Sequence, residues 1–135
     1  MGAAGLSVAF LLDTDVMIDF LRGQQQAVDF LREIELPLRL SAITVAELYA
    51  GVRDGEEKVV LSRALNACKI HPLTHDIAVR GGLLRRDFGR SHGVGLADAL
   101  IVATSQLHEL KLVSLNARHY PMLNDVRMPY RKANL

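Results

Sequence analysis

The sequence predicts an α/β fold in which a central parallel sheet is flanked by helices. Short strand candidates, the first of them a continuously apolar run, alternate along the chain with longer segments whose apolar residues recur at helical spacing. Continuously apolar runs are typical of strands buried on both faces of a parallel sheet. Strands that alternate with helices favour parallel pairing through right-handed crossovers. At 135 residues, we expect one domain over residues 1–135.

The first elements are expected to be a strand and two helices. Residues 8–12 form a continuously apolar run, as a buried strand would. Apolar residues at helical spacing predict a helix over 15–21, closed by Gly23. The same spacing predicts a second helix over 24–34, and Pro37 prevents it from continuing.

The middle of the chain repeats this alternation. A strand is expected over 38–41 and a helix over 44–52, which contains Ala46, Ala50 and Gly51. These small residues would allow another backbone to approach closely. A helix over 56–68 and a short strand over 69–72 follow.

The last third contains the longest predicted helices. Residues 75–90 form an amphipathic helix, and a glycine-containing loop precedes the most apolar helix of the chain, over 96–110. A strand is expected over 111–115, and Val126 is expected to begin a last one.

Composition narrows the class of protein. The chain is 50% hydrophobic, 23% charged and only 5% aromatic, which indicates a globular protein with an aliphatic core. Its net charge of +1 does not by itself indicate a nucleic-acid partner. No basic leader and no run near the ~18 apolar residues of a membrane span is found. Because no such run is found, we expect no membrane attachment, and because Cys68 is the one cysteine and cannot form an internal disulfide, we expect a cytoplasmic protein.

Three acidic residues stand in apolar surroundings. Asp13 closes the first apolar run, Glu47 lies within 41–51, and Asp98 lies within 95–103. Carboxylates are rarely placed there without a partner. If the fold brings them together, their repulsion calls for a cation, and hard oxygen ligands select Mg²⁺ or Mn²⁺. The sequence therefore predicts a metal-dependent enzyme.

Each acid also has a purely structural explanation. Thr44 and Glu47 match a capping box, which closes a helix N-terminus. Asp13 could be an N-cap, and Asp98 could lie near the start of its helix, where the helix dipole favours negative charge. The shared placement favours a site, because sites of open α/β sheets form beyond the carboxyl ends of the strands. Asp13 follows one predicted strand and Asn116 another.

Four stretches of the chain resemble the motifs of a known family. They are residues 11–15 (LLDTD), 41–48 (SAITVAEL), 96–103 (LADALIVA) and 112–120 (LVSLNARHY). They resemble the motifs of PIN-domain ribonucleases, specifically the VapC-type toxins of bacterial and archaeal toxin–antitoxin pairs. The resemblance spans nearly the whole chain, and the order and spacing of the short motifs make it specific.

The resemblance implies a PIN-like three-layer α/β/α domain that hydrolyses RNA at a carboxylate-bound Mg²⁺ or Mn²⁺ centre. By this resemblance, Asp13, Glu47 and Asp98 are the catalytic metal ligands. Asn116 stands where the family often has an acid, and it is expected to be a weaker ligand. A neutral residue there lowers the charge of the site.

Further residues are expected around this centre. Thr14 would orient the first carboxylate or a water, and Asp15 would support the ligands from behind. Basic residues are candidates for contact with RNA, although such residues are as often part of a solvated helix face: Arg85, Arg86, Arg118 and His119. For His119, a partly buried structural histidine is the alternative.

The resemblance also implies partners. They are an RNA substrate, a VapB-like antitoxin and a second copy of the chain. The apolar faces around Val16, Met17 and Phe20, or around Ile43 and Leu48, are candidate dimer contacts, and all five could equally be core.

The sequence is also compatible with two other functions. Asn116, in place of a fourth acid, allows a PIN-like module that binds RNA or protein without turnover, which a nuclease assay with Mn²⁺ would distinguish. Residues 13–16 also resemble the first motif of haloacid-dehalogenase-like phosphatases. That mechanism needs a downstream lysine and a later acid, for which Lys111 and Asp98 are poorly placed, and it would form a phosphoaspartyl intermediate.

Overall fold

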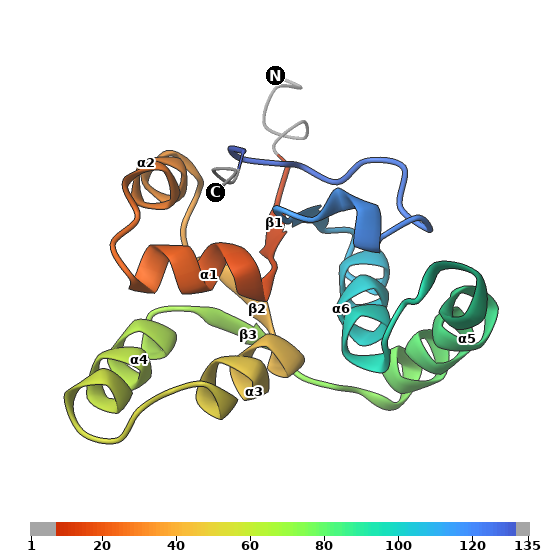
Figure 1. The fold of residues 1–135 in the computed structure, drawn as a ribbon, viewed down its shortest axis with the longest axis horizontal. Helices are drawn as coiled ribbons and strands as arrows, with labels where there is room; N and C mark the ends of the chain where they lie inside the picture. The colour runs from red at the N-terminus through yellow and green to blue at the C-terminus, as the bar shows by residue number, and fades with distance from the viewer. Residues whose placement is uncertain (1–7, 132–135) are drawn as a thin grey trace.

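The computed structural model describes residues 8–131. Residues 1–7, which contributed to the prediction of no leader segment, lie outside this range. The helices and strands run β1 (Phe10–Leu12), α1 (Thr14–Leu21), α2 (Gln25–Glu33), β2 (Arg39–Ser41), α3 (Ala42–Ala50), α4 (Glu56–Asn66), β3 (Lys69–His71), α5 (His75–His92), α6 (Leu96–Leu107), β4 (Lys111–Val113) and the 3₁₀ helix η2 (Ala117–His119). The strands lie between α1, α2 and α4 on one side and α5 and α6 on the other (Figure 1).

The strands pair in parallel, as the sequence predicts. In β1 and β4, Leu11 lies opposite Leu112, and in β2 and β3, Leu40 lies opposite Ile70. The strands are shorter than expected and form two two-stranded ladders, with β1 beside β2. The strand expected from Val126 does not form within the described residues, where Arg127 makes an isolated parallel bridge to Val113.

The helix boundaries follow local capping chemistry. Helix α3 begins at Ala42, because Ser41 is its N-cap and Ser41 Oγ accepts a hydrogen bond of 3.0 Å from the Ile43 N–H. The capping box expected between Thr44 and Glu47 is therefore wrong. Helix α5 continues to His92, where Gly93 closes it in the left-handed conformation with φ 66°.

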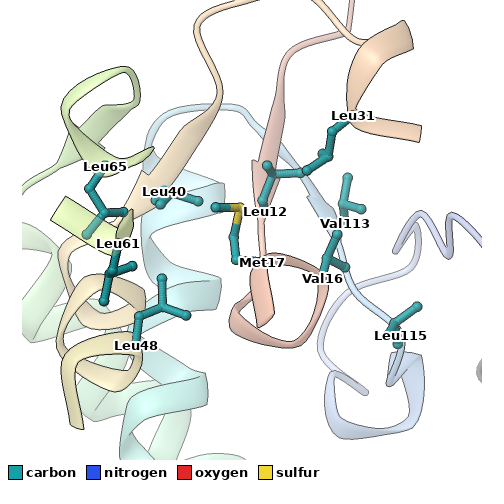
Figure 2. Packing of buried hydrophobic residues seen from close by; sticks show 10 residues of the cluster. All are labelled: Leu12, Val16, Met17, Leu31, Leu40, Leu48, Leu61, Leu65, Val113 and Leu115. Carbon is teal, nitrogen blue, oxygen red and sulfur yellow. The ribbon is translucent and has the colours of Figure 1, made fainter. Parts of the chain in front are cut away.

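The main apolar cluster fills the space between β1, β2 and helices α1, α3 and α4. Figure 2 shows its ten buried residues, Leu12, Val16, Met17, Leu31, Leu40, Leu48, Leu61, Leu65, Val113 and Leu115. Three of the candidate dimer contacts are thus core residues, which corrects that expectation: Val16, Met17 and Leu48. Phe20 and Ile43 pack as half-buried side chains. Cys68 packs against the same cluster as core filler.

A second cluster lies on the opposite face of the strands. Leu11 packs there with Ile101, Val102, Leu112 and Tyr120. Because successive side chains of a strand point to opposite faces, Leu11 and Leu12 anchor β1 in both clusters. The next residue, Asp13, is consequently held in a fixed position at the end of the strand.

Helix α6 is held tightly against α5. Gly81 of α5 faces Leu100 of α6, and a Cβ atom at Gly81 would come within 3.2 Å of the Leu100 Cα. The missing side chain therefore permits the close approach of the two helices. This packing fixes the first turn of α6, which carries Asp98. None of the helices in residues 8–131 is long and apolar enough to cross a membrane.

Candidate active site

The carboxylate of Asp13 lies at the end of β1 and is only 6% exposed. It also occupies the N-cap position of α1, where Oδ1 accepts a 2.8 Å hydrogen bond from the Thr14 N–H. Oδ2 accepts hydrogen bonds from the hydroxyls of Ser114 (2.8 Å) and Tyr120 (2.6 Å). The N-cap explanation is thus correct but incomplete, because two of the three donors come from the other end of the chain.

Asp98 and Asp13 both contact the hydroxyl of one tyrosine, Tyr120. Asp98 lies in the first turn of α6, half-buried, and its Oδ1 is 3.4 Å from the Tyr120 hydroxyl. The same hydroxyl donates to Asp13. Two of the three predicted acids are therefore brought to one place by a shared partner.

Glu47 joins the site through Thr14. The Thr14 hydroxyl donates a 2.6 Å hydrogen bond to Glu47 Oε1 and lies 3.1 Å from the Thr44 hydroxyl. Thr14 therefore orients Glu47 with its side chain, and it contacts Asp13 only through its backbone N–H. Glu47 is exposed, so it is open to solvent at the rim of the site.

Asp15 supports the site from behind. Its Oδ2 accepts a 3.0 Å hydrogen bond from the Leu115 N–H and lies 3.4 Å from the Ser114 hydroxyl. Oδ1 accepts from the Val16 N–H at 2.7 Å. Asp15 thereby ties the start of α1 to the segment after β4, as a supporting residue would.

The site gathers negative charge that no ion pair of the described residues neutralises. Burial, with the nearby Asp13 charge, raises the pKa of Asp15 to about 6. The same two causes raise the pKa of Asp98, and His119 opposes them. Burial and Asp13 also raise the pKa of Tyr120 far above its usual value, so its hydroxyl keeps its proton. The ion pairs found in residues 8–131, Arg86 with Asp87 and Lys111 with Asp125, do not involve these acids.

The donor atoms suit a small divalent cation. Asp13 and Asp98 offer carboxylate oxygens, and Mg²⁺ is commonly held by one or two carboxylates, with waters as its other ligands. Within residues 8–131, no three acidic, histidine or cysteine side chains lie close enough to share one ion. Glu47 as a direct ligand therefore stays a prediction, while its link through Thr14 is present.

The other predicted residues lie around this group. Asn116 is exposed, and its backbone N–H donates to Ser114 Oγ at 3.1 Å. No hydrogen bond joins its side chain to the acids within the part of the chain that is described. His119 is exposed and close enough to act on Asp98, so a buried structural role for it is wrong.

The basic candidates are all exposed. Arg118 lies on η2 beside His119, the residue that acts on Asp98. Arg85 and Arg86 lie on α5, where Arg86 pairs with Asp87 at 2.9 Å. Their contact with RNA stays a prediction.

Two residues of the site were not singled out by the sequence reasoning. Ser114 follows β4 directly and Tyr120 follows η2, and both donate to Asp13. A serine at the end of a predicted strand is visible in the sequence, although its burial is not. The tyrosine gives no such signal, and both contacts join residues more than 100 positions apart.

Comparison with known proteins shows which family this chain matches. A family model described as the PIN domain matches residues 10–122. Ribonuclease VapC10 of Mycobacterium tuberculosis is 39% identical over 123 residues, which cover 89% of this chain and 92% of that protein. Ribonuclease VapC19 of the same species is 36% identical over 124 residues, which cover 89% and 98%. These matches favour the PIN-domain resemblance over that to haloacid-dehalogenase-like phosphatases.

Solved structures show the same fold. A chain of a toxin–antitoxin complex from Klebsiella pneumoniae superposes with a TM-score of 0.81 at 30% identity, covering 92% of this chain and 100% of that one. A chain of FitAcB from Neisseria gonorrhoeae gives a TM-score of 0.71, also at 30% identity, over 89% and 97%. The three-layer arrangement of helices around parallel strands is common to them.

Proposed function

The chain belongs to the PIN domain family, with VapC-type ribonucleases as relatives, and we propose that it is a metal-dependent endoribonuclease, the toxin of a toxin–antitoxin pair. This proposal rests on the pairing of Asp13 and Asp98 around one hydroxyl, with neither acid in an ion pair among residues 8–131. Such a pair attracts a divalent cation. One PIN-like domain over residues 1–135 is the proposed working unit.

Asp13 and Asp98 would hold Mg²⁺ or Mn²⁺, with Glu47 and Asn116 contributing from the rim. When bound, the cation supplies a Lewis acid that lowers the pKa of water and balances charge on a phosphate. Glu47, oriented by Thr14, is placed to hold a water or accept its proton at Oε1. Asp15 holds the segment after β4 against α1, which keeps the proposed metal ligands at a fixed separation.

RNA is the proposed substrate, as the names of the relatives imply. His119 acts on Asp98, and Arg118 is its neighbour on η2; both are exposed, so they can meet a phosphate backbone that approaches the acids. Arg85 and Arg86 would extend this contact along α5. Single strands and loops are the expected targets, because their bases and backbone are accessible.

An antitoxin is the proposed protein partner, because the similar Klebsiella pneumoniae structure is a toxin–antitoxin complex. A groove beside Glu47 is lined by Ile18, Leu21 and Val60, and a VapB-like segment lying there would cover the rim of the site. A homodimer and a cytoplasmic location complete the proposal, the latter because Cys68 has no disulfide partner.

Cleavage of single-stranded RNA by the purified, antitoxin-free chain tests this proposal. We expect cleavage with Mg²⁺ or Mn²⁺ and none in EDTA. Asp98→Asn removes a ligand charge with almost no change in volume. It should lower the rate at least about a hundredfold, because even residues that only support a metal ligand contribute roughly 10- to 100-fold.

Asp29→Asn is the matched control, since Asp29 is exposed on α2 and hydrogen-bonds only Gln25. The control should cleave RNA like the parent. Full activity in EDTA, or parental activity in a folded Asp98→Asn variant, would contradict the metal-site proposal. A parent that binds RNA without cutting it would favour the non-catalytic alternative.

A further inference from the structure

We infer that Tyr120 is a positioning residue of the active site. Its hydroxyl donates its one proton to Asp13 and lies beside Asp98, so that the carboxylate of Asp13 is held next to the second acid for a divalent cation. This inference rests on the proposed function and extends it, because it assigns a role to a residue that does not itself bind the cation.

The geometry places the tyrosine hydroxyl between the two acids. It is 2.6 Å from Asp13 Oδ2 and 3.4 Å from Asp98 Oδ1. The residue is 2% exposed, and its ring packs with Leu11 and Ile101 in the second apolar cluster. The packed ring therefore holds the hydroxyl at a fixed position in the site.

The backbone around Tyr120 is equally constrained. The Tyr120 N–H donates to the Ala117 carbonyl at 3.1 Å, and the Tyr120 carbonyl accepts from the Leu123 N–H at 3.0 Å. Upstream, the Asn116 N–H is held by Ser114 Oγ. These bonds fix the turn that brings the ring to the site.

A count of lone pairs shows what the hydroxyl does to Asp13. A carboxylate has about four lone-pair sites. Thr14 fills one on Oδ1, and Ser114 and Tyr120 fill two on Oδ2. Rotating this carboxylate would break three hydrogen bonds, so its remaining acceptor site on Oδ1 is held in one orientation.

The chemical type of the donor matters as well. An arginine or lysine at this place would hold Asp13 but also neutralise it, and would compete with the cation. A phenol holds the carboxylate through one hydrogen bond and leaves its negative charge in place. Tyr120 thus fixes the orientation of the Asp13 carboxylate without reducing the attraction of that carboxylate for a divalent ion.

The test is a calorimetric titration of Mn²⁺ into the metal-free full chain. Tyr120→Phe keeps the ring and removes only the hydroxyl, and we expect the Mn²⁺ dissociation constant to rise about tenfold. Tyr130→Phe is the matched control, because the Tyr130 hydroxyl donates to another carboxylate of α1, Asp19, at 2.9 Å. This control should bind Mn²⁺ like the parent.

A purely structural role is distinguished by melting in EDTA. A Tyr120→Phe protein that melts earlier but binds Mn²⁺ with parental affinity would overturn the inference, and so would one that binds Mn²⁺ more tightly, since the hydroxyl would then compete with the ion. If this variant does not fold, Ser114→Ala takes its place, because it removes the other hydroxyl donor to Oδ2. It must weaken Mn²⁺ binding as well, and parental affinity would overturn the inference.

The parent separates this inference from the function on which it rests. A parent that binds Mn²⁺, with a Tyr120→Phe variant of equal affinity, overturns the role of Tyr120 alone. A parent that does not bind Mn²⁺ overturns the proposed metal centre and the positioning role together.

Discussion

Two polar clusters lie at strand ends of this molecule, and they resolve their charge in opposite ways. One joins Asp13, Asp15 and Asp98 through Ser114 and Tyr120. The other lies at the end of β3, where the 5% exposed ring of His71 is 3.4 Å from Arg39 Nη1. The ring of His108 lies 4.3 Å from that of His71 between centroids.

The histidine cluster avoids a charge on its buried ring. Burial, followed by the charges of His108, Arg39 and Lys69, lowers the pKa of His71, so this ring is neutral at pH 7. The acid cluster does not, because even Asp15, with a pKa of about 6, is ionised at pH 7. The difference between the two clusters indicates that a buried polar cluster binds a ligand when a change of protonation does not remove its charge.

The largest expected effect is a contrast in pH dependence in EDTA. The pKa of Asp15 rises from 3.8 to about 6 on folding, so the folded protein binds more protons in that window. The free energy of unfolding should therefore fall as the pH rises through it. Asp15→Asn should gain roughly 2–3 kcal/mol relative to the parent between pH 4 and 7, measured by urea denaturation.

His71 provides the opposite sign and serves as the control. Because its pKa is lowered below 6.5 on folding, the unfolded chain binds more protons, and His71 destabilises the fold as the pH falls below 6.5. His71→Gln should reduce that loss without affecting the window of Asp15. If both variants change the slope of the free energy of unfolding against pH with the same sign, the two clusters do not differ as described.

A smaller effect is expected from adding charge to the acid cluster. Asn116→Asp places a carboxylate on an exposed residue beside Ser114, where solvent screens it. It should tighten Mn²⁺ binding by no more than about fivefold, because an exposed charge contributes at most about 1 kcal/mol. Thermal melts with and without Mn²⁺ measure this. A metal-induced stabilisation equal to that of the parent would place Asn116 outside the site.

The sequence predicts most of the fold because the signals are local. The alternation of short strand candidates with helices locates all four strands of the described residues, although only three residues of each form a ladder. The start of α3 was misplaced by two residues, because Ser41 captures the Ile43 N–H before Thr44 can act as a cap. Ser41 and Thr44 are caps of similar strength, and only the strand that fixes the backbone before the helix decides which of them begins it.

The candidate site is predicted less completely, because its contacts are not local. Asp13 and Asp98 stand out as acids in apolar runs, whereas Tyr120 looks like an ordinary core aromatic. Its role depends on η2, which turns the chain back toward β1. The pairing of Thr14 with Glu47 likewise needs α1 and α3 to lie side by side, which spacing alone does not specify.

Binding of Mn²⁺ to three metal-free proteins decides whether the acid cluster takes a divalent cation and the histidine cluster does not. Calorimetry should show that the parent and His71→Gln bind Mn²⁺ equally and that Asp13→Asn binds at least about tenfold more weakly. Parental affinity in a folded Asp13→Asn protein, or loss of binding in His71→Gln, would contradict the account.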